Sequence, residues 1–427
     1  MSAQVVESSP TGLTIQITVP FGTSMLDFET QLQQQLNEAG NLATAEQLRR
    51  FDTDGSPIQV GSTTLYSKGP LPKEYQTPYG AVAIERHVYQ SAHGGATFCP
   101  LERHARIVVT STPLFAKIVS SKYADFGSER VRRDLRDNHG RSVSKCLIQD
   151  LADAVAAVAL AKEESWTYRL PDWDVPPATV SVGLDGSCMH LSEDGWRETM
   201  VGTLGFYDAD GERLHTIYLG ATPEYGKATF LERLAREVER AKAKLPEARY
   251  IGIADGAKGN WEFLERHTAA QVVDFWHAAE YLGAAASVVF RGQDLARKSW
   301  LEEMCHVLKH EAGGAGRVIR ELRSKARVRP WAKASEEVVA ALRYFENQNG
   351  AGRMDYASRV AAHDPIGSGV TEAACKVIVK QRLCGSGMRW KGAGAAAVLS
   401  LRCLNYTPER WEQFWSKVDQ YGFPVAA

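Results

Sequence analysis

The sequence predicts an α/β protein whose mixed sheet is interrupted by an all-helical insertion and preceded by a mixed N-terminal region. Three observations predict this architecture. Between residues 176 and 282, strand-like and helical runs follow in the order three strands, helix, strand, helix, strand, helix. Between 283 and 363 the strands stop, and three helical stretches follow one another. Before residue 166, three short helical periods follow a β-hairpin pattern with a Gly-Gly turn region.

The order of elements after residue 176 is that of a ribonuclease H-like fold, in which strand ends gather at the edge where open α/β sheets bind ligands. An unstructured loop that filled the segment between Asp255 and Glu372 would be implausibly long, so we expect a helical insertion there. The main fold resumes at Pro365. We expect the following regions: 1–74, an N-terminal region, helical (24–51) and then turn-rich, without an assigned role; 75–165, a β-hairpin and a helix-turn-helix DNA-binding region; 176–282 with 364–403, the ribonuclease H-like catalytic domain; 283–363, the helical insertion domain; and 404–427, a C-terminal helix and tail.

Composition is that of a globular protein with more than one core. The chain has 427 residues, of which 44% are hydrophobic and 24% charged. It contains no run of about 18 apolar residues, so no membrane span is predicted. The first residues lack the basic flank of a signal peptide. Seven scattered cysteines without a C-x-x-C pair argue against a disulfide framework and a structural zinc site. We expect a cytoplasmic protein.

Positive charge is concentrated in three segments, although the net charge is −1. Lys376–Arg402 contains six Lys/Arg and no Asp or Glu, Arg291–Lys333 contains eleven against five, and Lys117–Lys145 contains eight against four. Such segments can neutralise phosphates in one groove of a neutral protein. Each segment alone could also be a solvated face.

Three carboxylates carry the chemistry that we predict. Asp185 ends the apolar run VSVGLD, Asp255 ends YIGIAD, and Glu372 follows IGSGVT at the start of an expected helix. A two-metal phosphoryl-transfer site needs carboxylate oxygens around two hard cations, with positions left open for phosphate and water. Two aspartates at strand ends and one glutamate on a later helix meet this need. The sequence therefore predicts chemistry on a nucleic-acid backbone.

Each of these carboxylates has an ordinary alternative role. Asp185 precedes Gly186 and could form a hairpin turn. Asp255 could be a turn residue or the N-cap of the next helix. Glu372 could pair with Lys376 one turn later on an exposed face. Taken together, in the order strand, strand, helix, they favour catalysis.

Asp274 and His277 end the next expected strand and lie close to the predicted metals in this fold. They could orient a ligand carboxylate or contact the scissile phosphate. Alternatively, Asp274 caps a helix beneath which Trp276 and His277 pack. The sequence leaves both interpretations open.

The helix-turn-helix prediction rests on two short helical periods joined by a turn. Ser128 and Ser142 are candidate N-caps, and residues 138–140 (Asn-His-Gly) are a candidate helix stop. In this interpretation Ser142, Ser144 and Lys145 present the first turn of a recognition helix to a major groove. An ordinary three-helix packing unit is the alternative.

Further DNA-binding candidates follow Glu372. A helix N-terminus preceded by glycines favours anions, and a Gly-rich loop with basic residues around an aromatic suits a DNA backbone and an exposed base. Trp390 could equally be a core anchor. The candidates are Lys376, Lys380 and Arg382 on the helix and Arg389, Trp390 and Lys391 in the loop.

At these residues the chain resembles the bacterial insertion-sequence DDE transposases of the ISKra-type group, which are related to Mutator-like and hAT-like transposases. The resemblance runs from about Thr77 to about Trp415, and the glutamate segment is its most specific part. The matching motifs are TPYGAVAIERHVY, CPLERHARIV, LDG (184–186), ADGA (254–257), DFWHAAEYL (274–282), RMDYA (353–357) and IGSGVTEAACKVIVKQRLCGSGMRW (366–390).

The resemblance implies that Asp185, Asp255 and Glu372 form the catalytic triad and that Asp274 and His277 meet a C/D-x-x-H motif. The expected activity is cleavage at the ends of an insertion sequence and joining of 3′-hydroxyl ends to target DNA, with two Mg²⁺, replaceable by Mn²⁺, held by the triad. Expected partners are double-stranded DNA (terminal inverted repeats and target) and a second copy in a homodimer or larger oligomer, in a nucleoid-associated bacterial protein. The alternatives are a structure-selective DNA nuclease and an inactive DNA-binding regulator.

Overall fold

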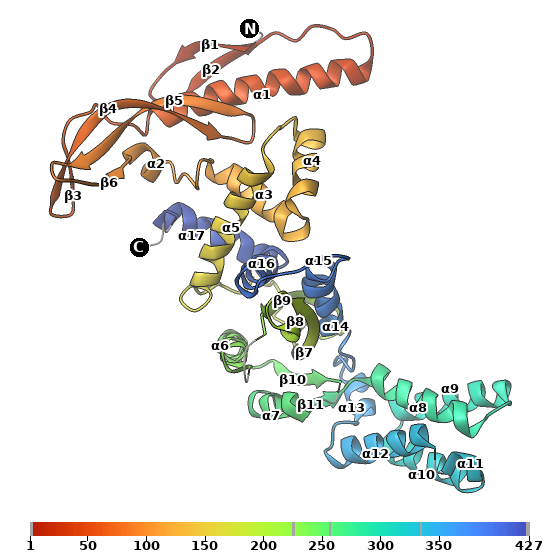
Figure 1. Ribbon diagram of the computed structural model, residues 1–427. Coiled ribbons are helices and arrows are strands. Elements are labelled where there is room, and N and C mark those ends of the chain that lie inside the picture. The colour runs from red at the N-terminus through yellow and green to blue at the C-terminus, as the bar shows by residue number, and fades with distance from the viewer. Residues whose placement is uncertain (1–2, 224–226, 256–257, 334, 424–427) are drawn as a thin grey trace. The chain divides into compact units, whose positions relative to one another are not determined.

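The computed structural model describes residues 3–223, 227–255, 258–333 and 335–423 (Figure 1). The chain divides into two compact units, one made of Met1–Tyr168 with Ser400–Ala427 and the other of Arg169–Leu399. Both units combine helices and sheets, so the protein is mixed α/β as expected. Within the described ranges, no helix is both long and apolar enough to cross a membrane.

The first unit begins with a two-stranded antiparallel sheet and the 25-residue helix α1, followed by a four-stranded antiparallel sheet in the order β3-β4-β5-β6. Leu48 of α1, Tyr75 of β4 and Ile84 of β5 share a small core. The expected hairpin is formed by β5 and β6. The elements are β1 (Ala3–Ser8), β2 (Leu13–Ile17), α1 (Met25–Arg49), β3 (Ile58–Val60), β4 (Thr63–Gln76), β5 (Ala81–Ser91) and β6 (Gly94–Phe98).

The description of the segment after α1 as turn-rich is wrong for β4, a 14-residue strand. The strand was not predicted from the sequence because its segment contains Pro70 and Pro72. They pair with His87 and Glu85 of β5, but β3 pairs only with the first three residues of β4, so the prolines lie where the other side of β4 is open. Residues two apart direct their N–H groups to the same side of a strand. Proline, which lacks this donor, is tolerated at such an edge.

Three helices in the first unit correspond to the predicted helical periods. Gly140 ends α4 with a φ of 61°, as expected. The caps differ from the prediction: Gly127 precedes α4, and Ser144, not Ser142, caps α5 by accepting from the N–H of Leu147. A capping side chain must lie three residues before the N–H that it accepts, and Ser142 is too early. Besides α1, this unit contains α2 (Pro100–His104), α3 (Pro113–Asp125), α4 (Ser128–His139), α5 (Lys145–Lys162) and α17 (Pro408–Tyr421).

The second unit is built on a five-stranded sheet in the order β11-β10-β7-β8-β9. Three consecutive strands, β7, β8 and β9, pair antiparallel, and β10 and β11 are added parallel to β7. The strands are β7 (Thr179–Leu191), β8 (Gly195–Tyr207), β9 (Arg213–Ala221), β10 (Arg249–Ala254) and β11 (Ala270–Val273).

Helices cover both faces of this sheet, as the close approaches of three glycines show. A Cβ at Gly202 would meet α6, and one at Gly252 would meet α7. A Cβ at Gly183, on the opposite face by the alternation of side chains, would meet α14. The helices are α6 (Ala228–Lys244) and α7 (Lys258–His267) on one face, and α14 (Gly369–Ala374), continued by the π-helix η2 (Cys375–Lys380) and α15 (Gln381–Leu383), on the other; α16 (Gly392–Asn405) follows.

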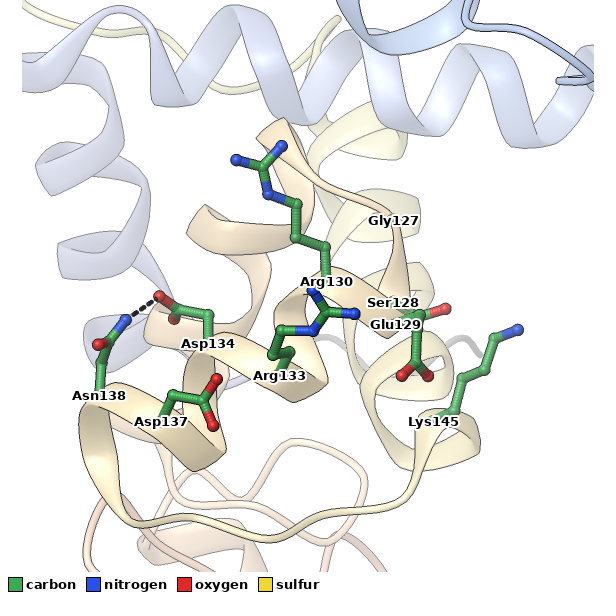
Figure 2. Close-up of a pocket in the computed structure, with 9 residues that line it drawn as sticks. All are labelled: Gly127, Ser128, Glu129, Arg130, Arg133, Asp134, Asp137, Asn138 and Lys145. Atoms are coloured by element: carbon green, nitrogen blue, oxygen red, sulfur yellow. Dashed lines mark hydrogen bonds between the residues drawn. The ribbon is translucent and has the colours of Figure 1, made fainter.

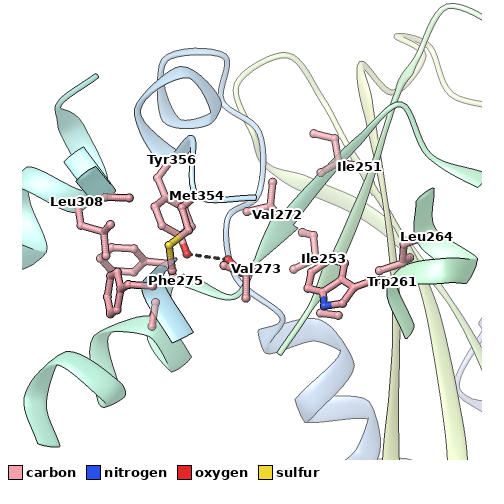
Figure 3. Packing of buried hydrophobic residues seen from close by; sticks show 14 of the residues in the cluster. Ile251, Ile253, Trp261, Leu264, Val272, Val273, Phe275, Leu308, Met354 and Tyr356 are labelled. Atoms are coloured by element: carbon pink, nitrogen blue, oxygen red, sulfur yellow. Dashed lines mark hydrogen bonds between the residues drawn. The ribbon is translucent and has the colours of Figure 1, made fainter. Parts of the chain in front are cut away.

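The regular elements described between β11 and α14 are all helices, as predicted, and residues of this segment share the core of the sheet (Figure 3). Tyr356 packs on the ring of Phe275, and its hydroxyl donates to the carbonyl of Val273 across 2.9 Å. Tyr356 of the RMDYA motif therefore holds the insertion against β11. The helices are α8 (Phe275–Val289), α9 (Asp294–His310), α10 (Gly314–Arg327), α11 (Pro330–Lys333), α12 (Glu336–Gly350) and α13 (Tyr356–Ala361).

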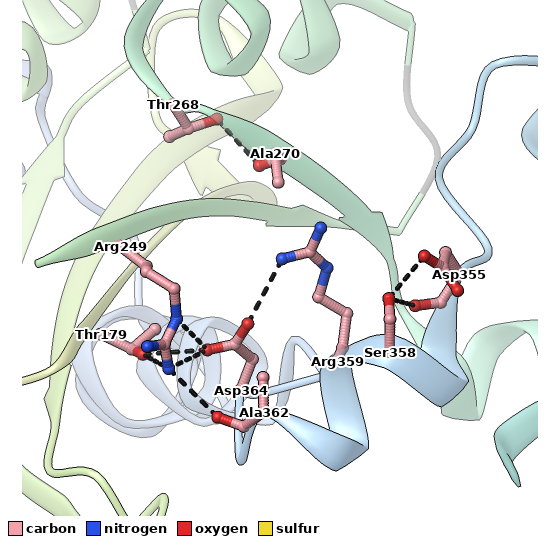
Figure 4. Close-up of polar contacts among 9 residues, drawn as sticks. All are labelled: Thr179, Arg249, Thr268, Ala270, Asp355, Ser358, Arg359, Ala362 and Asp364. Atoms are coloured by element: carbon pink, nitrogen blue, oxygen red, sulfur yellow. Dashed lines mark hydrogen bonds and ion pairs between the residues drawn. The ribbon is translucent and has the colours of Figure 1, made fainter.

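The buried carboxylate of Asp364 closes the insertion onto the sheet (Figure 4). It accepts from Arg249 at the start of β10 across 2.8 Å and from the hydroxyl of Thr179 at the start of β7 across 2.9 Å. Arg359 of α13 is a further donor at 3.3 Å. Because a buried charge must be paired, this contact fixes where the chain returns to the sheet.

Candidate active site

The parallel register of β7 and β10 brings Asp185 and Asp255 to the same level of the sheet. Gly183 lies opposite Ile253, so two further residues along each strand set Asp185 beside Asp255. By the alternation of side chains, both carboxylates lie on the face that α14 covers. Asp255 directly follows β10, as predicted.

Asp185 does not end its strand, contrary to the prediction. It pairs with Val201 of β8, and β7 continues for six residues to Leu191. The hairpin-turn interpretation of Asp185-Gly186 is therefore wrong, because the β7–β8 turn lies at residues 192–194. The parallel neighbour β10 ends at Ala254. Asp185 therefore lies at the edge of the parallel part of the sheet, whereas the antiparallel pairing of β7 with β8 continues beyond it.

Glu372 reaches the same place because α14 packs very closely on β7 and β8. The hydroxyls of Thr371 and Thr203 are 2.8 Å apart and buried. A Cβ at position 183 would lie 2.1 Å from Oγ1 of Thr371, so glycine is needed there. Glu372 is exposed at the first turn of α14, and its carboxylate accepts from the Ser368 hydroxyl across 2.5 Å. In the described part of the chain, no ion pair joins it to Lys376.

Asp274 holds the loop before α14 in place. One carboxylate oxygen accepts from the N–H of His277 across 2.6 Å, which caps α8, and the other accepts from the N–H of Ser368. Asp274 is 1% exposed, so its role is structural. Of the two open interpretations, the structure agrees with helix capping. Trp276, however, is not packed beneath the helix, because it is 65% exposed.

These elements surround one cavity of about 240 Å³. Asp185, Asp255 and Glu372 all line it, and so does His277, whose Nδ1 lies 3.5 Å from the Glu280 carboxylate. Glu280 was missed by sequence reasoning, although its spacing of one helical turn from His277 within the DFWHAAEYL motif could have indicated it. The full lining is Leu184, Asp185, Ile253, Ala254, Asp255, Trp276, His277, Glu280, Ser368, Thr371 and Glu372.

The insertion contributes to the site through Tyr344 of α12. Its hydroxyl donates to the backbone carbonyl of Asp255 across 3.3 Å. Its ring stacks on that of Tyr281 with the ring centres 4.2 Å apart, and His277 contacts both rings edge-on. Residues 256 and 257, part of the ADGA motif, lie outside the described residues, and so does the proposed turn or cap at Asp255.

Burial raises the pKa of the Asp185 carboxyl above its ordinary value of 3.8, and the negative charges of Asp255 and Glu372 raise it further. The N–H of Gly186, which donates across 2.7 Å, acts in the opposite direction. The Cys375 thiol donates to the other oxygen across 3.6 Å. Burial and the neighbouring Asp185 raise the pKa of that thiol to about 12. Such crowding of carboxylates is what a bound cation would relieve.

Within the described ranges, no group of three or more His, Cys, Asp or Glu side chains is arranged so that it could hold a metal ion. Carboxylate oxygens are the ligands that Mg²⁺ takes, and three carboxylates line the same cavity. Glu372 bonds to Ser368 here. Metal binding would therefore require its carboxylate to turn from Ser368 toward the two aspartates.

No family model matches this chain, and no curated protein matches it either.

The predicted DNA-binding residues after Glu372 divide into two groups. Lys376, Lys380, Arg389 and Lys391 are exposed. Arg382 is 3% exposed, with its guanidinium 5.1 Å from the centre of the Trp390 ring, so the prediction that it contacts DNA is wrong. Arg382 belongs to α15, and its side chain is buried.

Trp390 fastens the Gly-rich loop to the end of β7. Its carbonyl accepts from the N–H of Ser192 across 2.9 Å, and its backbone bridges to Leu191. The ring is half-buried and covers Arg382. Trp390 is thus not a core residue, although its backbone holds the loop against β7, and Arg389 and Lys391 on either side of it are exposed.

In the first unit, the predicted recognition residues Ser142, Ser144 and Lys145 are all exposed at or before the start of α5. Ser144 is occupied as the helix cap. Lys145 borders a surface pocket of about 720 Å³ together with Arg130 and Arg133 of α4 (Figure 2). Sequence reasoning missed these two arginines, which were visible only as part of the basic segment 117–145.

Proposed function

We propose that this protein is a DNA transposase that cuts DNA at the ends of its insertion sequence and joins the 3′-hydroxyl ends to target DNA. The observation that carries the proposal is the meeting of Asp185, Asp255 and Glu372 around one cavity of about 240 Å³. They come from β7, β10 and α14, elements that are far apart in the chain. A set of three carboxylates at one such place is what two-metal phosphoryl transfer requires.

The strand order β9-β8-β7-β10-β11 supports a ribonuclease H-like core, with three antiparallel strands followed by two parallel ones. Helices on both faces are consistent with this fold. So is the position of Glu372, which returns to the sheet after the helical insertion. The proposal of a two-metal site and the fold proposal thus agree on the same three residues.

Asp185 and Asp255 would hold the first Mg²⁺, and Glu372 would complete the second. When bound, the two ions would supply charge stabilisation to the phosphate and activation to the attacking oxygen. Asp274 positions the site by tethering Ser368 next to the α8 cap. His277, half exposed at the cavity, is placed to donate a hydrogen bond to a phosphate oxygen.

DNA would be held by exposed cations of both units. Lys376, Lys380, Arg389 and Lys391 follow Glu372 and can neutralise backbone phosphates near the cut. In the first unit, we assign recognition of terminal repeats to the α4–α5 helix-turn-helix, including Lys145. A homodimer follows from the chemistry, because two element ends must be brought together.

The test uses the full-length protein with Mg²⁺ or Mn²⁺ and labelled duplex DNA carrying the sequences that flank its gene. Asp255→Asn removes one charge with little change in shape, and Glu302→Gln on the exposed face of α9 is the matched control. We expect metal-dependent nicks at a defined end and joined products, lost in Asp255→Asn and kept in Glu302→Gln.

Two other results would replace the proposal. Cleavage without joined products would identify a structure-selective nuclease that uses the same site. Binding without cleavage, unchanged by Asp255→Asn, would identify a DNA-binding regulator and remove the catalytic role of the triad.

A further inference from the structure

A second pocket lies in the same unit, at the end of β10 opposite to the candidate active site. Its volume is about 600 Å³, within the range of ligand pockets, about 300–1,000 Å³. Arg249 opens β10 and Asp255 follows its end. Six residue steps of about 3.3 Å separate them by about 20 Å along the strand. One phosphate therefore cannot contact both sites.

Four permanent cations from four elements line this pocket. They are Lys242 in the last turn of α6, Arg249 of β10, Arg266 in the last turn of α7 and Arg359 of α13. None belongs to the residues that the candidate active site uses. The convergence of four elements is a property of the fold, since the cations are spread over 117 positions of the chain.

Two carboxylates offset part of this charge. Asp364 lies between Arg249 and Arg359, at 2.8 and 3.3 Å (Figure 4). Glu239 pairs with Lys242 at 2.9 Å and lies 3.5 Å from the His267 ring. Four cations against these two carboxylates leave an excess of two positive charges, even with His267 neutral.

Two of the four cations, Arg249 and Arg359, are held in position by the buried Asp364. Arg249 donates to Asp364, to the Thr179 hydroxyl and to the carbonyl of Ala362. The Arg249 side chain is nevertheless 46% exposed, which leaves room for it to donate to a further anion. Arg266 is exposed at the rim. Fixed, partly exposed guanidinium groups are well suited to phosphate oxygens.

The remaining lining favours a backbone phosphate over a free nucleotide. The floor consists of backbone and small apolar side chains, including Ala248, Ala269 and Ala270. Of the two aromatic rings in the lining, Tyr250 is 6% exposed with the Lys242 ammonium over its ring, and His267 packs on Phe263 with its side chain 16% exposed. A base therefore has no open aromatic face on which to stack in this pocket.

We propose that this pocket, formed by Lys242, Arg249, Arg266 and Arg359, binds a phosphate of the DNA backbone about 20 Å from the phosphate that is cut. The inference rests on the proposed function in its choice of DNA as the ligand. The pocket adds a second contact to the same unit, so that a DNA segment beyond the cut is held while the triad acts.

The test measures binding without cleavage, so that it fails independently of the proposed function. A labelled duplex of about two helical turns, roughly 20 base pairs, is titrated in EDTA at several salt concentrations. Lys242→Ala/Arg266→Ala removes two pocket cations and spares Arg249 and Arg359, which hold Asp364. Lys68→Ala/Lys73→Ala on β4 removes the same charge from the other unit. Inorganic phosphate is titrated in parallel at constant ionic strength.

We expect the slope of log affinity against log salt to fall by about one in the pocket variant, because one phosphate contact is lost and each such contact contributes roughly 0.9. The β4 variant should keep the slope. An unchanged slope in the pocket variant, with a lower melting temperature, would overturn the proposal. It would indicate that Lys242 and Arg266 stabilise the helix ends at which they lie and do not bind DNA. Pocket-dependent binding of inorganic phosphate with an unchanged duplex slope would overturn the DNA ligand in favour of a free phosphate.

Discussion

The thiol of Cys375 donates a hydrogen bond to Oδ2 of Asp185 across 3.6 Å. Cys375 is one turn after Glu372, where α14 passes into the π-helix η2. The same helical segment therefore carries the candidate metal ligand Glu372 and the hydrogen-bond partner of the candidate ligand Asp185. π-Helical segments are often found at functional sites. The contact orients the Asp185 carboxylate, whose other oxygen is held by Gly186.

Cys375→Ala should raise the Mn²⁺ concentration needed for half-saturation about tenfold. This is the low end of the effect that the loss of a metal ligand's hydrogen-bond partner has on metal affinity, because a thiol is a weak donor. Cys375→Ser, which keeps a donor, should recover most of the affinity. Mn²⁺ binding is measured by electron paramagnetic resonance without DNA. Equal affinity in the alanine variant and the unmodified protein would show that the thiol does not position Asp185.

Gly183→Ala should displace α14 and with it Glu372. The new methyl would lie 2.1 Å from Oγ1 of Thr371, which is fixed against Thr203. We expect a loss of about 1–3 kcal/mol in unfolding free energy and a larger loss of cleavage than of DNA binding. Gly316→Ala on α10 is the control, because its methyl would meet nothing closer than 3.6 Å. Urea unfolding of both variants checks this, and equal stabilities would contradict it.

Asp274→Ala should cost more than the loss of a helix cap. Ser335→Ala removes a comparable cap from α12 and should cost about 1 kcal/mol. Asp274→Ala also leaves the buried N–H of Ser368 without its acceptor, which adds about 1–3 kcal/mol. Thermal unfolding compares the two. Cleavage should fall only in the Asp274 variant, since only that contact holds the loop before Glu372.

The pH dependence of stability should carry the sign of a raised carboxyl pKa. Because the folded protein holds a proton on Asp185 more tightly than the unfolded chain does, stability from this group falls as pH rises from about the ordinary value of 3.8 through the folded pKa. Asp185→Asn should therefore stabilise the metal-free protein at pH 7 and flatten this part of the profile.

Added Mg²⁺ should reverse the order of stability of the unmodified protein and the Asp185→Asn variant. It should raise the melting temperature of the unmodified protein and leave that of Asp185→Asn nearly unchanged, because ligand binding to the folded state stabilises it. Denaturant titrations between pH 4 and 8, with and without Mg²⁺, make the comparison. A destabilised Asp185→Asn protein at pH 7 without metal would contradict the assigned sign.

Local patterns were sufficient for most elements of the second unit. Alternating apolar runs predicted β8–β11, and helical spacing predicted α6 to α10 and α12, since both periodicities follow from which face is buried. They failed at Asp185-Gly186, where a common turn signal lies inside β7. They failed again at Pro70 and Pro72, which β4 tolerates because one side of it is open.

The three carboxylates were predicted as one site, but only packing could show which of the flanking candidates reach solvent. Arg382 has the sequence context of a DNA contact, yet it is buried under Trp390. Asp274 has the context of a metal-site residue, yet both its oxygens are used in capping and tethering. These outcomes depend on Ser368, more than 90 positions after Asp274, and on the Trp390 ring that covers Arg382.

By itself, the sequence determined most strands and helices of the second unit, the chemical identity of the three carboxylates and the presence of a helical segment between the last two. Those features depend on side-chain periodicity and residue type, which are local. The tertiary structure alone decided that Asp185 and Asp255 share one level of the sheet, that Gly183 admits α14, and that four scattered cations form a second pocket. Such relationships depend on strand register and on close packing between distant segments, and neither is encoded in the spacing of residues along the chain.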